Sequence, residues 1–313
     1  MKRRDFFKNT AITALGTTFL GPLSALAGTT ETHLESEDLS ERSQLKDDYP
    51  VHFLALGDWG RNGADHQLPV ARQMGKWATD NPNDFIMALG DNFYPRGVVS
   101  EHDPLWHYSF ESIYTEFPLQ WDWYPILGNH DYMGDPDAQV RYSKVSRRWV
   151  MPSRYYSKEV SLKGKGKLLL LFIDTNPLIP EFADNAHYGP NVAGQQPEKQ
   201  LAWIDKKLSE ASADVKWTMV IGHHPIYTVG PRIKNYDTLA VRKALEDVLK
   251  SIRSMYTCLV MTILSSTWIC LASPRNLFVV RGQKLLLLLL EYPTAGLRQL
   301  IMGSCISQSM TTD

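Results

Sequence analysis

Residues 50–250 are predicted to form an α/β fold, and two observations support this prediction. Apolar runs typical of buried strands alternate along this segment with runs of helical periodicity. Several of the apolar runs end in a glycine, which permits a tight turn, followed at once by a polar residue. Because ligands in such folds bind at the carboxyl ends of strands, these polar residues predict a binding site at one sheet edge.

The predicted elements are apolar runs that read as strands and segments with apolar residues at helical spacing. In chain order they are the strand VHFLALGDWG (51–60), the helix ARQMGKWATD (71–80), the strands DFIMALGDNFY (84–94), WYPILGNHDY (123–132) and GKLLLLFIDTN (166–176), the helix EKQLAWIDKKLSEA (198–211) and the strand KWTMVIGHHP (216–225).

Length and composition are those of an ordinary soluble enzyme. The 313 residues allow one large domain or two small ones, and 43% are hydrophobic while 21% are charged. The net charge of −1 gives no reason to expect a face that binds nucleic acid. The three cysteines, Cys258, Cys270 and Cys305, all fall in the last fifth of the chain and imply no disulfide framework.

The first 27 residues have the organisation of an export signal. A basic start precedes a mildly apolar stretch, which ends in the small-residue run Ala-Leu-Ala at 25–27. The pair Arg3-Arg4 followed by DFFK resembles a bacterial twin-arginine signal, and an ordinary secretory signal or a membrane anchor are the alternatives. We therefore expect the twin-arginine machinery to export the protein to the periplasm or beyond. Residues 28–49 read as a polar, acidic linker.

Four polar residues follow apolar runs and glycines in succession: Asp58, Asp91, Asn129 and His223. Any one of them alone would be explained as a helix cap or a structural histidine. Together, carboxylate, amide oxygen and imidazole are the ligands that divalent and trivalent metals accept. A carboxylate such as that of Asp91 can bridge two metals, and a metal pair can stabilise both the attacking and the leaving oxygen of a phosphoryl transfer.

The motifs GDWG, GDNFY, GNHD and GHHP, in this order, resemble those of the calcineurin-like metallophosphoesterases. The tyrosine of GDNFY narrows the resemblance to the purple acid phosphatases of the small tartrate-resistant type. This resemblance implies a four-layer sandwich of two mixed β-sheets flanked by helices over residues 50–250. It also implies a phosphomonoester hydrolase with Fe(III) and a second ion, Fe(II), Zn or Mn, in which a metal-bound hydroxide attacks the phosphorus.

The resemblance assigns roles to the motif residues one by one. Asp58 would bind the ferric ion, Asp91 would bridge both metals, and Tyr94 would bind the ferric ion as the phenolate that gives the purple colour. Asn129 and His223 would bind the divalent ion.

Three further residues are assigned to the substrate side of the site. His130 matches the histidine of the family that contacts phosphate or the leaving oxygen. Asn92 and His224 are candidate substrate-binding residues, although His224 also fits a place behind the ligands or at the rim. Other histidines with loop-like contexts are expected at the surface or the substrate entrance: His66, His102, His107 and His187.

A fifth motif of the family, Gly-His-x-His, is absent from the sequence as written. Its two histidines would complete the two metal sites, yet where it is due the chain reads LVMTI (259–263), and all nine histidines lie at or before His224. Taking the last base of each codon with the first two of the next, the codons for these residues permit Gly-His-Asp-His. The Asp is fixed, because Met has a single codon, ATG, and every Thr codon begins with AC.

We therefore hypothesise a change of reading frame between about Leu249 and Met255. Residues 251–313 would then be an aberrant tail, which explains why they hold all three cysteines, no histidine and only two acidic residues. The last strands of the domain are accordingly expected to be missing or replaced. The run Leu285–Leu290 is far too short to span a bilayer.

Two other functions stay open beside the phosphatase. Because the written sequence lacks one ligand for each metal, the protein could be an inactive or weakly metal-binding remnant of such an enzyme. The same fold could also serve a metallophosphodiesterase or a phosphate-binding module.

Overall fold

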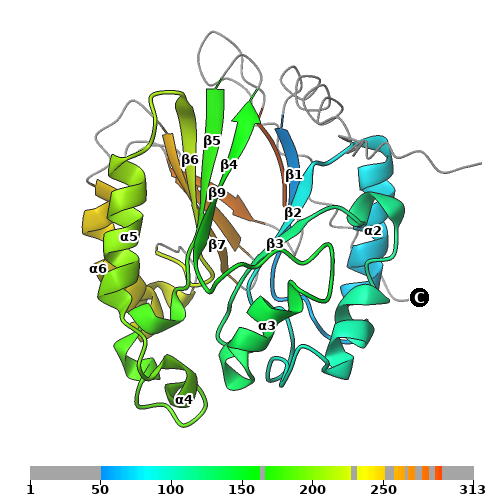
Figure 1. Ribbon diagram of the computed structural model, residues 1–313, viewed down its shortest axis with the longest axis horizontal. Helices are drawn as coiled ribbons and strands as arrows, with labels where there is room; N and C mark the ends of the chain where they lie inside the picture. The colour runs from blue at the N-terminus through cyan, green and yellow to red at the C-terminus, as the bar shows by residue number, and fades with distance from the viewer. Residues whose placement is uncertain are drawn as a thin grey trace, which may run out of the picture. The chain divides into compact units, whose positions relative to one another are not determined.

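The protein is an α/β structure with two mixed β-sheets and helices beside them (Figure 1). One sheet has the strand order β10-β1-β2-β3, in which β1, β2 and β3 are parallel and β10 is antiparallel. The other has the order β4-β5-β6-β7-β8-β9, in which β5, β6 and β7 are parallel. The computed structural model describes residues 51–162, 166–226, 231–250, 257–264, 267–271, 277–281 and 286–290.

The elements of the described residues have the following bounds. The strands are β1 Val51–Leu56, β2 Phe85–Leu89, β3 Trp123–Ile126, β4 Tyr156–Leu162, β5 Gly166–Phe172, β6 Val215–Ile221, β7 Thr257–Leu264, β8 Thr267–Leu271, β9 Leu277–Arg281 and β10 Leu286–Leu290. The α-helices are α2 Gln67–Asp80, α3 Pro136–Tyr142, α4 Gly189–Val192, α5 Pro197–Ser209 and α6 Tyr236–Lys250. Shorter helices are η1 Trp106–Glu111, η2 Phe117–Leu119, η3 Asp131–Met133, η4 Asn176–Leu178, η5 Pro180–Phe182 and η6 Pro231–Lys234.

Every strand and helix predicted from the apolar pattern is confirmed. The five predicted strands are β1, β2, β3, β5 and β6, and the two predicted helices are α2 and α5. The sequence analysis did not predict β4, α3, α4 or α6. The predicted signal and linker, residues 1–49, lie outside the described residues.

Parallel pairing brings the ends of the predicted strands to a common edge. Leu56 of β1 pairs with Ala88 of β2, and Leu89 of β2 pairs with Ile126 of β3. Because parallel strands end on the same side, the loops that follow them emerge together. The motifs GDWG, GDNFY and GNHD therefore leave the first sheet at one edge.

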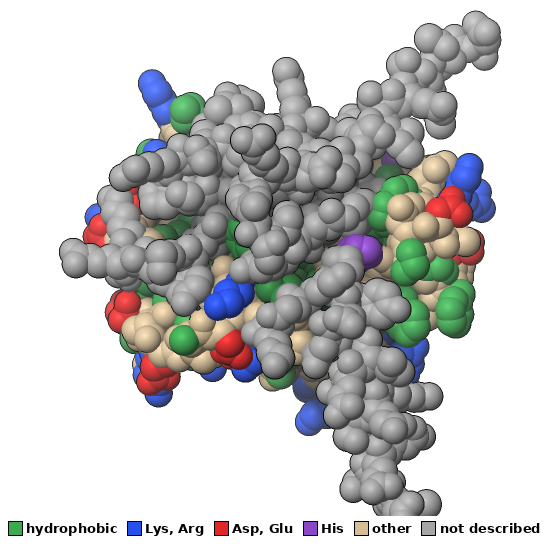
Figure 2. All heavy atoms as spheres, turned by 90° about the horizontal axis from the view of Figure 1, so that it is seen from above, with side chains coloured by type: hydrophobic (Ala, Val, Ile, Leu, Met, Phe, Trp, Pro, Cys, Tyr) green, Lys and Arg blue, Asp and Glu red, His purple; other side chains and the backbone are tan. Residues whose placement is uncertain are grey.

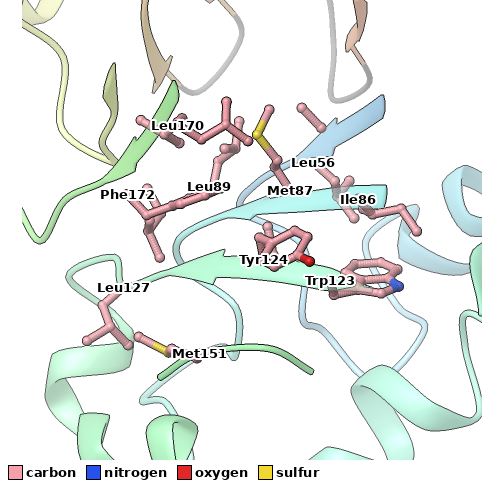
Figure 3. Packing of buried hydrophobic residues seen from close by; sticks show 14 of the residues in the cluster. Leu56, Ile86, Met87, Leu89, Trp123, Tyr124, Leu127, Met151, Leu170 and Phe172 are labelled. Carbon is pink, nitrogen blue, oxygen red and sulfur yellow. The ribbon is translucent and has the colours of Figure 1, made fainter. Parts of the chain in front are cut away.

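The hydrophobic core lies between the facing sheets. Figure 3 shows Met87 and Leu89 of β2 opposite Leu170 and Phe172 of β5. All four side chains are fully buried, and the ring of Tyr124 in β3 stacks 5.9 Å from that of Phe172. Burial of each such side chain contributes about 1.5–3 kcal/mol to stability. This packing holds the two sheets together and so positions the strands from which the motif loops emerge. On the outer sides of the sheets, α2 lies beside β1 and β2, and α5 and α6 lie beside the sheet that contains β5 and β6 (Figure 1).

An aromatic cluster anchors the first motif loop. Trp59 of GDWG is 3% exposed, and its indole Nε1 donates a hydrogen bond of 3.1 Å to Asn92 Oδ1. Buried aromatic pairs at these separations add to the stability from area burial alone. Five aromatic rings have centroids 5.3–6.5 Å from that of Trp59: Phe93, Phe110, Tyr114, Trp123 and Trp149.

The region of the predicted aberrant tail contains strands. Four of them, β7 to β10, lie within residues 257–290, and β7 pairs in parallel with β6 while β10 pairs antiparallel with β1. The expectation that the last strands are missing is therefore wrong for the described residues. That their amino-acid sequence replaces another one stays a prediction.

The described surface carries charges of both signs. On the face shown in Figure 2, acidic and basic side chains of described residues lie interspersed along the same edge. This agrees with the net charge of −1 and offers no extended basic surface among the described residues of that face. Each helix within the described ranges is too short or too polar to cross a membrane.

Candidate metal centre

Three of the predicted ligands meet where loops from the two sheets come together. Asp58, Asp91 and His223 each offer a ligating atom, and these atoms lie within 4.8 Å of one another. Asp91 Oδ1 is 3.5 Å from His223 Nε2, and these two residues are only 3% and 6% exposed. Residues from GDWG, GDNFY and GHHP, far apart in the chain, thus form one cluster.

Tyr94 joins this cluster through its hydroxyl group. Its Oη lies 2.8 Å from Asp58 Oδ1 and 2.7 Å from Asp91 Oδ2, so its one hydroxyl proton is shared between the two carboxyl groups. Burial, followed by the charges of the two carboxylates, raises the pKa of the Tyr94 phenol well above its usual range. A trivalent cation beside the same three side chains would reverse this effect, because a metal ion is the dominant local charge in a site.

His223 is held in the orientation that a metal ligand needs. Its Nδ1 lies 2.9 Å from the carbonyl oxygen of Leu89, which can only accept, so Nδ1 carries the proton. The lone pair of Nε2 then faces Asp91. Burial acts to lower the pKa of His223, but the charges of Asp91 and Asp58 outweigh it and raise the pKa. A backbone carbonyl behind the ring is the usual support for a metal-binding histidine.

Asn129 and His130 lie at the exposed side of the cluster. The backbone N–H of His130 donates to Asp91 Oδ1 at 2.8 Å, and its Nε2 is 3.9 Å from Asp91 Oδ2. Asn129 Nδ2 lies 3.5 Å from the hydroxyl of Tyr188, which leaves its Oδ1 available as a ligand. His130 therefore contacts Asp91, and the roles assigned to Asn129 and His130 stay predictions.

Asn92 occupies a different place from the one expected of a substrate-binding residue. It is fully buried, and its Nδ2 donates to the carbonyl oxygen of Ile126 at 2.7 Å and to Gln139 Oε1 at 3.0 Å. Its Oδ1 accepts the hydrogen bond from Trp59. Because both ends of the amide are used inside the protein, Asn92 supports the loops and does not face a substrate.

His224 is buried behind the cluster and is not at its rim. It is 2% exposed, its Nδ1 lies 2.7 Å from Thr175 Oγ1, and its ring is 5.0 Å from that of His223. Burial, and then the neighbouring His223, lower the pKa of His224 well below its usual range. The sequence left two places open for His224, behind the ligands or at the rim, and the structure shows it behind the ligands. The four loop histidines, His66, His102, His107 and His187, are exposed.

Asp131 is a site residue that the sequence analysis missed. The residue is fully buried and accepts hydrogen bonds from the backbone N–H groups of Asn92, Phe93 and Gly128, at 2.8–3.2 Å. Burial and the nearby charge of Asp91 raise its pKa to about 7. Its carboxyl group ties the GDNFY loop to the GNHD loop. Its place in GNHD was the signal that could have identified it.

Positive φ angles and close packing occur at two of the ligands. Asp58 and Asp91 both adopt the left-handed conformation, with φ of 57° and 49°, as do Asn62, Asp65 and His66 in the loop before α2. Asp and Asn adopt this conformation more readily than other non-glycine residues. A Cβ on Gly128 would lie 2.2 Å from Asp91 Oδ1, and one on Gly90 would lie 2.6 Å from His223 Nδ1. The glycines of the motifs therefore leave the space in which the ligands approach one another.

We expect Gly90→Ala to lower metal affinity by more than about 10–100-fold, the loss typical when a partner behind a metal ligand is removed. The added methyl would push His223 away from Asp91. Gly194→Ala is the matched control, because Gly194 also has a positive φ, 80° against 88° for Gly90, but no atom within 4 Å of the added Cβ. Metal titration and thermal unfolding of both variants separate the contact from the backbone strain. Equal metal affinity in the two variants would contradict the packing argument.

The donor set fits a pair of metal ions. Burial and the charge of Asp91 raise the pKa of Asp58, although His223 and Tyr94 act in the opposite direction. Carboxylates crowded in a buried place are stabilised when a cation neutralises them. Carboxylate and phenol oxygens suit a trivalent iron, and imidazole and amide donors suit a divalent ion.

Residues 51–250 match the calcineurin-like phosphoesterases. The chain belongs to this family. The resemblance seen in four short motifs is thereby confirmed, and the clustered aspartates, tyrosine and histidine of this phosphoesterase are the motif residues themselves.

The phosphoesterase is related to purple acid phosphatases. It is 36% identical over 211 residues to purple acid phosphatase 17 of Arabidopsis thaliana, a match that covers 66% of this chain and 60% of that protein. It is 34% identical over 188 residues to mouse tartrate-resistant acid phosphatase type 5, which covers 57% of each chain. The chain therefore spans less than two thirds of the length of these relatives.

Solved structures of low identity share the fold. GAP50, the anchor in the inner membrane complex of Plasmodium, has a TM-score of 0.59 at 21% identity, covering 76% of this chain and 80% of its own. A dimetal phosphatase from Danio rerio has a TM-score of 0.52 at 14% identity, covering 77% and 93%. At such identities the likeness concerns the architecture alone.

Proposed function

We propose that the protein is an exported acid phosphatase that hydrolyses phosphomonoesters at a dinuclear metal centre. The observation that carries the proposal is the meeting of Asp58, Asp91, Tyr94 and His223, on loops that follow strands of both sheets. The relationship to purple acid phosphatases supports the same reaction. The four-layer arrangement expected for that family is in keeping with the two sheets and their outer helices (Figure 1).

The residues divide naturally between two ions. Asp58 and Tyr94 would hold the ferric ion, Asn129 and His223 would hold Fe(II), Zn or Mn, and Asp91 would contact both. Bound ions would supply Lewis acidity toward the phosphate oxygens and activate water as the nucleophile.

We assign His130 the role of assisting the leaving group, and its surroundings support this. Its Nδ1 donates to the carbonyl oxygen of Pro95 at 2.7 Å, and its Nε2 is on the side of Asp91. The side chain is 30% exposed, so a substrate can reach it. In the doubly protonated ring, Nε2–H can donate a proton to the departing alkoxide, which is general acid catalysis.

The proposal is tested by comparing a phosphomonoester with a phosphodiester at acid pH. p-Nitrophenyl phosphate and bis(p-nitrophenyl) phosphate share a leaving group, so their rates compare the reaction class directly. Faster monoester hydrolysis, removed by chelation, supports the acid phosphatase. Faster diester hydrolysis favours the phosphodiesterase, and two bound metals without turnover favour the binding module or the inactive remnant.

Export follows from the sequence of the first 27 residues. We expect the mature protein to begin near Gly28 and to lie in the periplasm or outside the cell, because of Arg3-Arg4 and the Ala-Leu-Ala run. Replacing both arginines with lysine should leave the precursor in the cytoplasm. Cell fractionation and the N-terminal sequence of the mature chain provide the measurement, with Lys2→Arg as a control of similar charge. Normal export of the double-lysine variant would exclude the twin-arginine route.

A further inference from the structure

Arg61 contacts Tyr94, the predicted ferric ligand, and has no role in the proposed phosphatase mechanism. Its guanidinium carbon lies 3.5 Å from the centroid of the Tyr94 ring. The side chain is 30% exposed and lies 3.4 Å from Asp65, which is 69% exposed. The ring of Tyr94 also lies 4.3 Å from that of His130. Tyr94 is therefore in contact with both the Arg61 guanidinium and the His130 imidazole.

The loop that carries Arg61 is fixed on both sides. Gly60 accepts a hydrogen bond of 2.7 Å from the backbone N–H of Tyr94, and a Cβ on Gly60 would lie 1.8 Å from the carbonyl oxygen of Asn92. The backbone N–H of Arg61 donates to Oε1 of the buried Gln67 at 2.8 Å. The backbone at Arg61 is therefore fixed beside Tyr94, and its guanidinium lies over the Tyr94 ring and also contacts the exposed Asp65.

We propose that Arg61 is a positioning residue that holds the Tyr94 ring and stabilises negative charge on it when Tyr94 binds iron. The inference rests on the proposed function, because it concerns Tyr94 as a ferric ligand. A guanidinium over a neutral aromatic ring is already attractive, and the attraction grows when the ring carries the charge of a phenolate. Arginine suits this role better than lysine, since its planar group stacks on the ring.

The colour of the iron-loaded protein gives a direct measure of this contact. Light absorption in an iron–phenolate unit moves an electron from the ring to the metal. A cation over the ring favours the electron on the ring, so it raises the energy of the transition. Removal of the Arg61 charge should therefore shift the visible band to longer wavelength.

The experiment uses the chain with its reading frame restored near codons 249–255, loaded with iron, and three substitutions. Arg61→Met keeps the aliphatic stem without the charge, and Arg61→Lys keeps the charge without the planar group. Arg72→Met, on an exposed position of α2, removes the same charge away from the site. We expect a shift to longer wavelength in Arg61→Met, a smaller one in Arg61→Lys and none in Arg72→Met.

The outcomes separate this inference from the proposed function. Coincident bands in Arg61→Met and the parent overturn the role of Arg61 and leave the phosphatase untouched. A coloured parent without phosphatase activity counts against the proposed reaction and leaves the role of Arg61 intact. A parent that takes up no ferric ion, or takes it up without colour, overturns both. If Arg61→Met does not fold, as judged by circular dichroism, the presence or absence of a shift in Arg61→Lys decides.

Discussion

In the frame-restored chain, Asp91→Ala is expected to remove both metal ions and to abolish phosphatase activity. Asp91 faces two other members of the cluster with different oxygens: Oδ1 lies 3.5 Å from His223 Nε2 and Oδ2 lies 2.7 Å from Tyr94 Oη. Loss of a group that merely supports a ligand reduces metal affinity or activity by about 10–100-fold, so loss of a bridging ligand should exceed this. Metal content per chain and hydrolysis of a phosphomonoester are the measurements.

Two companion variants make this result specific. Asp91→Asn keeps the size of the side chain and an oxygen for the His130 N–H, but it lacks the charge and the second oxygen needed to bridge two ions. It should therefore behave like Asp91→Ala. Asp205→Ala, at an exposed position of α5, should retain metal and activity. Two metals per chain in Asp91→Ala would show that the ligand assignment is wrong.

Much of this cluster could be predicted because each ligand directly follows a buried parallel strand. The pairing of β1, β2 and β3 fixes where the strands end, so GDWG, GDNFY and GNHD had to meet at one edge. The apolar runs that identify strands are also the part of the pattern least dependent on tertiary context. The strands and the approximate site were therefore accessible from the sequence.

The direction of each side chain in the loops was not accessible in this way. Asn92 is adjacent to Asp91, yet it points inward to Gln139, because the loop turns at Asp91 with a positive φ. The supporting groups, such as the Leu89 carbonyl behind His223 and the Asp131 carboxyl between two loops, depend on contacts across the fold. Helix α6, in contrast, could have been predicted from the sequence, because its apolar residues have amphipathic helical spacing.

The change of frame near residue 250 stays a prediction, and two findings are compatible with it. The match to the calcineurin-like phosphoesterases ends at residue 250, within the interval where the sequence predicts the change of frame. The chain covers only 60% of purple acid phosphatase 17, the relative with which it shares 36% identity. Both observations are in keeping with a domain whose continuation is encoded in another frame.

The pairing of β7 with β6 brings residues 259–263, whose codons permit Gly-His-Asp-His in another frame, near the loop that carries His223. Strand β7 runs parallel to β6, with Val220 opposite Val260 and Ile221 opposite Met261. Residues 262–264 of β7 therefore extend past the end of β6, at the level where His223 follows. Histidines encoded near positions 260–263 would stand at the sheet edge where the metal sites need their last two ligands.

Restoring the frame near codons 249–255 is therefore expected to restore both metal binding and activity. On the proposed assignment, the 313-residue chain would supply Asp58, Asp91, Tyr94, Asn129 and His223, which would leave each metal short of one ligand. Its residues after 250 are rich in leucine and poor in charge, so the chain as written should also be poorly soluble. Loss of a direct ligand from each metal should reduce affinity and activity by more than about 100-fold.

The comparison requires three proteins expressed in parallel. The first is the chain as written, the second is the frame-restored chain that reads Gly-His-Asp-His, and the third is the frame-restored chain with both of these histidines replaced by alanine. We expect two metals and rapid phosphomonoester hydrolysis only in the second. The third separates the ligands from the rest of the restored tail, because it should be soluble and yet inactive. If the chain as written binds two metals and turns over as fast as the second protein, residues 251–313 supply the missing ligands themselves and the frame change has no functional consequence.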